Sequence, residues 1–326
     1  MTPSAPVTYA AKTVWNHSPH YPVIGKERGN RGEISGMLPP YPMEAGEPAQ
    51  RGIPTVLDVL QFEFMRNAIY AGLLASVVCG VIGTYVVVKR IVFISGGISH
   101  ASFGGLGLAT WLAIPQLYGA LAFSLLAAVL IGLVNRYGRE REDTLIGALW
   151  ATGMAMGILF IDMTPGYAVD PTSILFGDIL RVSSADVWLV LALNIVVVAT
   201  VVFFYKEFLA VSLDQEFAQL RGVPVGVIYL LLLCLVALTI VIMLRVVGIV
   251  LVVALLTLPA AISRWYTSQL HTMMILSSVL GGVFIMSGLA ISYLTDRPAG
   301  ACIILTAAAV YAVVWALRRV SWAPAA

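Results

Sequence analysis

The chain has 326 residues, of which 60% are hydrophobic and 11% are charged. A soluble domain carries roughly 25% charged residues, so this composition indicates an integral membrane protein. The net charge of +2 and the lack of a basic cluster interleaved with aromatic residues exclude nucleic acid as a partner.

The N-terminal part differs in composition from the rest. Residues 1–52 are rich in proline, glycine and mixed charge, and no basic start is followed by an apolar run, so this is not a signal peptide. We expect an irregular tail over 1–52 and a transmembrane domain over 53–326.

Apolar runs long enough to cross a bilayer follow one another through the second part. They lie near 66–88, 92–113, 118–135, 145–162, 186–205, 227–244, 246–263, 272–294 and 300–318. The count is eight or nine, depending on whether "LRVVG" (244–248) is a true loop. A spanning chain must satisfy its backbone internally, so the predicted fold class is all-α, a polytopic membrane protein. Trp111, Trp150, Trp188 and Trp265 lie near span ends, which is typical of an aromatic belt.

Basic residues orient these spans. With nine spans, Lys89, Lys206, Arg264 and the pair Arg318 and Arg319 all follow odd-numbered spans. The positive-inside rule places that side in the cytoplasm. The loop at 164–186 is then external, and its apolar middle, "SILFGDILRV", predicts a segment that re-enters the membrane or lies on its surface.

One histidine lies within a predicted span, in "ISGGISHASFGGLGLA" (94–109). On a helix, His100 shares a face with Gly97, Gly104 and Gly107, which favours close approach of another helix. An ionisable residue inside a span often marks a substrate path, and a neutral imidazole suits zinc, iron or manganese. The alternative is that His100 makes a hydrogen bond across a tight helix contact.

The segment 206–226 lies on the predicted cytoplasmic side. "DQEFAQL" puts Phe217 and Leu220 on one helical face, with Asp214 and Glu216 at the start, where acidic residues suit a helix. Gly222 is expected to end this helix. It is either a docking helix for a cytoplasmic partner or an ordinary amphipathic connector.

From Phe64 to Leu317 the chain resembles the permease subunits of zinc, manganese or iron ATP-binding-cassette importers. The motifs that carry the resemblance, in order, are "FMRNAIYAGLLASVVCGVIGTYVVVKR", "ISHASFGG", "SILFGDILRVSSADV", "SLDQEFAQLRGVPV" and "VVGIVLVVALLTLPAAISR". The resemblance implies a plasma-membrane permease that works as a homodimer, with a cytoplasmic ATPase and an extracytoplasmic metal-binding protein as partners. It implies that Asp214, Glu216, Phe217, Leu220 and Gly222 form the coupling segment to the ATPase.

The chain itself has no G-x-x-x-x-G-K-[ST] loop for phosphates, so we expect no enzyme activity, no bound cofactor and a divalent metal ion as cargo. The family commonly has an acidic residue four positions before the histidine, where this chain has Gly96. A lone histidine is a weak site, because transition metals usually take three or more ligands. Asp178 and Asp162 are candidate substitutes, although Asp162 also fits a cap near a span end.

Two other classes remain as alternatives. A secondary transporter driven by an ion gradient would need no ATPase, and 206–226 would then be a connector. A membrane-embedded enzyme would need clustered His, Asp and Glu residues within the spans, which this chain does not offer. The sequence does not say which metal is carried.

Overall fold

The computed structural model of the chain describes residues 62–137, 142–166, 176–177 and 179–321. The predicted tail lies outside these residues and stays a prediction. The described helices all belong to the compact unit Ile53–Ala326. No strand occurs within the described residues, and the prediction of an all-α polytopic fold is confirmed.

Nine helices in the described part are long and apolar enough to cross a membrane, which confirms the higher of the two counts. They are α2 (Glu63–Val88), α3 (Val92–Trp111), α4 (Gln116–Tyr137), α5 (Glu142–Asp162), α7 (Ser184–Phe203), α10 (Val225–Val247), α11 (Ile249–Tyr266), α12 (Leu270–Thr295) and α13 (Ala299–Ser321). Three shorter helices are η1 (Ile179–Arg181), α8 (Tyr205–Leu213) and α9 (Gln215–Leu220).

The break between α10 and α11 is shorter than a loop. The question left open for 244–248 is answered: α10 continues to Val247, and Gly248 alone separates the two helices. Gly248 has φ +79°, a conformation that a residue with a Cβ rarely adopts. The backbone of Gly177, also at positive φ, packs against this turn. Residues 176–177, which belong to the loop after α5, therefore pack over the turn between α10 and α11.

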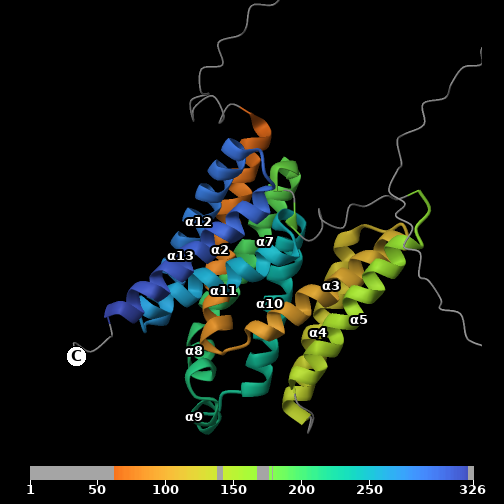
Figure 1. The fold of residues 1–326 in the computed structure, drawn as a ribbon. Helices are drawn as coiled ribbons and strands as arrows, with labels where there is room; N and C mark the ends of the chain where they lie inside the picture. Colours follow the sequence, from red (N-terminus) through yellow and green to blue (C-terminus); the bar gives the residue numbers. More distant parts are fainter. Residues whose placement is uncertain (1–61, 138–141, 167–175, 178, 322–326) are drawn as a thin grey trace, which may run out of the picture. The chain divides into compact units, whose positions relative to one another are not determined.

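The spans pack as two groups joined by α10 (Figure 1). In the first group α2 contacts α7, α11 and α12, and α12 contacts α13; in the second, α3 lies between α4 and α5. Helix α10 contacts members of both groups. In a membrane, close contacts between helices depend on small residues rather than on hydrophobic burial. Within the second group, glycines of α3 accordingly lie against glycines of α4 and α5.

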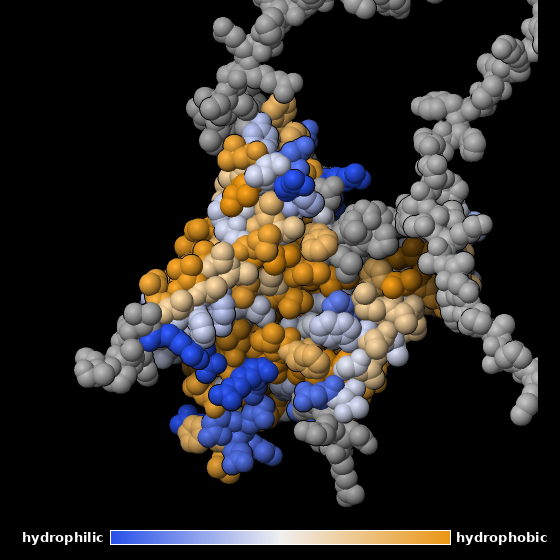
Figure 2. Space-filling view, viewed as in Figure 1, coloured by the Kyte–Doolittle hydropathy of each residue, from blue (hydrophilic) through white to orange (hydrophobic). Residues whose placement is uncertain are grey.

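Basic residues gather at one end of the bundle. Lys89 donates from Nζ to the Val211 carbonyl oxygen of α8 at 2.9 Å, and Arg264 of α11 donates to the Val87 carbonyl oxygen at 3.3 Å. At the other end, Arg245 of α10 pairs with Asp186 of α7, with 2.8 Å between Nε and Oδ1. Figure 2 shows apolar surface over the middle of the spans and hydrophilic patches toward both ends. The residues that orient the chain thus share one end, as predicted, and its cytoplasmic assignment stays a prediction.

Candidate functional site

The glycine face of α3 is a helix contact. A Cβ at Gly104 would lie 2.9 Å from the Gly153 carbonyl oxygen of α5, and one at Gly107 would lie 2.5 Å from that of Gly157. Any larger side chain would push the two helices apart, because these neighbours are backbone atoms that cannot rotate away. The predicted close approach of another helix to this face is realised by α5.

His100 lies within this contact, beside the first half of α5. Its imidazole stacks on the indole of Trp150, with 4.1 Å between ring centroids and 15° between planes. The side chain is half-buried, and its Nδ1 is a buried atom without a hydrogen-bond partner among the described residues. The alternative prediction, that His100 forms a hydrogen bond across the contact, finds no such bond in the described part of the chain.

Trp150 also covers Gly96. A Cβ at Gly96 would lie 2.9 Å from the Trp150 ring, so the indole fills the space that a side chain at this position would take. The assignment of Trp150 to an aromatic belt is therefore wrong: the residue lies within α5 and not at its end, and its ring packs on His100 and over Gly96. Trp111 and Trp188, which are exposed near helix ends, do fit a belt.

The described residues do not complete a metal site around His100 within one chain. They contain no group of three or more His, Cys, Asp or Glu side chains that could hold a metal ion. Asp162 is the last residue of α5, twelve residues beyond Trp150, and 1.5 Å of rise per residue puts it about 18 Å away along the helix. Asp178 lies outside the described residues. A lone imidazole must therefore find further ligands elsewhere.

The serines beside His100 donate hydrogen bonds to their own helix. Ser95, Ser99 and Ser102 are buried, and their hydroxyls donate to carbonyl oxygens of their own helix at 2.6–2.8 Å. Hydroxyls bonded back to the helix satisfy themselves locally and leave no donor for a neighbour. These serines are small packing residues that let α3 sit deep in the bundle.

The segment after α7 forms two short helices at the basic end. Asp214 caps α9, its carboxylate accepting from the Phe217 backbone N–H at 3.0 Å, as the acidic start of the segment predicts. Helix α9 ends at Leu220, and Gly222 follows at φ +79° with open space around it. Glu216 is exposed in the first turn.

Helix α9 buries one small residue and exposes its large apolar ones. Ala218 is fully buried against the rest of the protein, whereas Phe217 is 50% exposed and Leu220 is 87% exposed. The Arg221 guanidinium lies 4.7 Å from the Phe217 ring centroid, which keeps a charge beside the apolar face. A six-residue helix cannot be stable by itself, so this exposed face is held by its anchors at Ala218 and the Asp214 cap.

Lys89, singled out in the sequence only for orientation, ties this segment to the spans. Besides its bond to Val211, its Nζ lies 5.8 Å from the Tyr229 ring centroid of α10. Burial lowers the pKa of the Lys89 ammonium. A cavity of about 230 Å³ lies here, lined by Lys89 and Arg90 before α3, Asp143 of α5 and Gln215 of α9. The start of the helix that carries His100 and the coupling segment therefore border one cavity.

Nine spans, an imidazole in the contact between two of them, and an exposed apolar helix at the basic end define a polytopic membrane transport protein. Residues 61–318 match the ABC 3 transport family, and the chain belongs to that family. It is a multi-pass protein of the plasma membrane.

Individual relatives agree with this assignment. An uncharacterized membrane protein of Synechocystis is 46% identical over 82% of this chain and 95% of its own. The manganese transport system membrane protein MntC of Halalkalibacterium halodurans is 34% identical over 78% of this chain and 88% of its own. The solved structure of PsaBC from Streptococcus pneumoniae in complex with Fab is 32% identical, with a TM-score of 0.73 over 79% of this chain and 94% of that chain.

Proposed function

We propose that this chain is the permease subunit of an ATP-driven importer of divalent metal ions. Family membership carries the proposal, and the relatives that are named for manganese transport favour manganese among the candidate metals. The chain would supply the path, and a cytoplasmic ATPase would hydrolyse ATP, since the sequence has no phosphate-binding loop of its own.

The exposed face of α9 is the proposed dock for the ATPase. Phe217 and Leu220 offer an aromatic and an aliphatic side chain in one patch, the composition that anchors protein interfaces. A movement of α8 and α9 would reach the start of α3 through Lys89, because Lys89 lies between α2 and α3 and donates to the Val211 carbonyl oxygen of α8. Alternating access then consists of α3 and α5 shifting as ATP binds and is hydrolysed.

His100 is the proposed ligand in the path. One chain provides one imidazole, and a homodimer would provide two, with water or another donor completing the shell. A metal-binding protein outside the cell would deliver the ion to this path. The imidazole must be neutral to bind a metal ion, because a protonated ring has no free lone pair.

Complementation tests this function. A bacterial strain that cannot grow without added manganese would receive the chain together with a candidate ATP-binding-cassette ATPase from the same organism. We expect growth at low manganese with both proteins and none with either protein alone. Growth supported by the chain without the ATPase would instead indicate a transporter driven by an ion gradient.

A further inference from the structure

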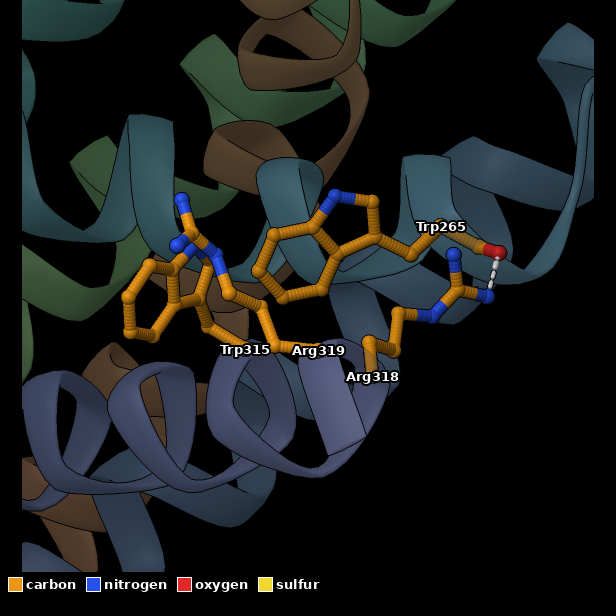
Figure 3. Close-up of a pocket in the computed structure, with 4 residues that line it drawn as sticks. All are labelled: Trp265, Trp315, Arg318 and Arg319. Carbon is orange, nitrogen blue, oxygen red and sulfur yellow. Dashed lines mark hydrogen bonds between the residues drawn. The ribbon is translucent and has the colours of Figure 1, made fainter. Parts of the chain in front are cut away.

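A second pocket lies at the C-terminal ends of α11 and α13, away from His100 and α9. It has a volume of about 410 Å³ and is lined by Trp265 of α11 and by Trp315, Arg318 and Arg319 of α13 (Figure 3). Pockets that hold small molecules or headgroups have volumes of a few hundred Å³. Neither the proposed metal path nor the coupling segment uses any of these four residues.

The two arginines have different roles. Arg318 donates to the Trp265 backbone carbonyl oxygen, and its guanidinium lies 5.2 Å from the Tyr266 ring centroid, so it fastens α13 to the end of α11. The Arg319 guanidinium lies 4.6 Å from the Trp315 ring centroid, and no carboxylate among the described residues pairs with it. A guanidinium stacked on an indole keeps its N–H edge available for a bidentate acceptor.

The pocket lies at one end of two candidate spans. Trp265 is the penultimate residue of α11, and Trp315, Arg318 and Arg319 lie in the last two turns of α13. Arg264, next to Trp265, donates to the Val87 carbonyl oxygen and so places the pocket at the basic end of the bundle with Lys89. Indoles concentrate at this depth, and basic pockets between spans on the cytoplasmic side suit anionic lipid headgroups.

We propose that this pocket binds the phosphate of an anionic phospholipid in the leaflet on the side of α8 and α9. The Arg319 guanidinium donates hydrogen bonds to the phosphate oxygens. Trp315, which is 45% exposed, contacts the glycerol and the start of the acyl chains. Arg318 keeps the pocket open by holding α13 against α11. The proposal depends on the chain lying in a membrane, and does not depend on which ion it carries.

Native mass spectrometry of the full chain in mild detergent tests the site. The probes are dioleoyl phosphatidylglycerol and dioleoyl phosphatidylcholine, which share acyl chains and differ in headgroup charge. We expect tighter binding of the anionic lipid and an about five-fold loss in Arg319→Gln, the effect of one basic residue near the surface. Arg297→Gln is the control, because Arg297 is exposed at the opposite end of the bundle.

Three results would overturn the proposal: equal affinity for the two lipids, equal losses in Arg319→Gln and Arg297→Gln, or displacement of the lipid by soluble glycerol 3-phosphate at comparable concentration. The last result would assign the pocket to a free phosphate compound. If Arg319→Gln does not purify as a homogeneous protein, Trp315→Leu carries the same expectation, because that side chain contacts the lipid and not the α11 backbone.

Discussion

The contact between Gly96 and Trp150 makes a quantitative prediction. A Cβ at Gly96 would lie 2.9 Å from the indole, closer than real Cβ atoms approach another carbon, so Gly96→Ala must displace the ring from its stack on His100. Overpacking of this kind costs about 1–3 kcal/mol, and at about 2–4 °C per kcal/mol the midpoint of thermal unfolding should fall by roughly 2–12 °C. Size-exclusion analysis after heating in detergent measures this midpoint.

A double-mutant cycle and a matched glycine isolate the cause. In a Trp150→Leu background the cost of Gly96→Ala should largely vanish, leaving a coupling energy of about 1–3 kcal/mol. Gly147→Ala is the control, since a Cβ there meets nothing within 4 Å, and it should be neutral or stabilising by up to about 1 kcal/mol. A Gly96→Ala variant as stable as Gly147→Ala would refute the packing described here.

The remaining predictions concern the metal, the coupling route and the topology. Manganese at about 100 times its Kd should stabilise the chain by about 2.7 kcal/mol. His100→Ala should abolish this stabilisation, whereas the control His271→Ala, at an exposed histidine, should keep it. Stabilisation that survives in His100→Ala would show that His100 is not a ligand. Lys89→Met should lower the free energy of unfolding by about 1.5 kcal/mol, because the bond to Val211 is lost, and should weaken the coupling of ATP hydrolysis to uptake. Lys206→Met, at an exposed lysine, is the control for both measurements. Equal behaviour of the two variants would contradict the coupling route. The topology is tested in a background that lacks Cys79, Cys234 and Cys302. Gln219→Cys should react with a membrane-impermeant thiol reagent only from the cytoplasmic side, and Met163→Cys should react only from outside. The reverse pattern would mean that the topology is inverted.

The spans and their ends could be predicted because their signals are local. Twenty apolar residues define a span without any knowledge of its neighbours. Gly222 and Gly248 both stand at helix ends with positive φ, and Pro224 caps α10, as their residue types indicate. The stretch 244–248 stayed undecided because Arg245 interrupts an apolar run, whereas its pair with Asp186 lets it lie in the last turn of α10.

The surroundings of His100 could not be predicted in the same way. The stack with Trp150 joins residues fifty positions apart on different helices, and no local pattern encodes such a contact. One signal was present: Gly153 and Gly157 repeat on α5 at a helical spacing that complements Gly104 and Gly107. Matching these two glycine faces would have paired α3 with α5 and brought Trp150 near His100. Asp178 as a ligand stays a prediction.

The most direct test of the central claim is manganese uptake into proteoliposomes that contain the chain, its ATPase and an ATP supply, with the metal-binding protein added outside. We predict uptake that requires ATP hydrolysis and falls by at least about 30-fold in the double variant Phe217→Asp, Leu220→Asp, the effect of losing about 2 kcal/mol at a docking patch. Leu294→Asp, at a leucine that is 75% exposed at the opposite end of the bundle, should leave ATP-driven uptake intact. Uptake that proceeds without the ATPase, or that is unchanged in the α9 double variant, would contradict the account.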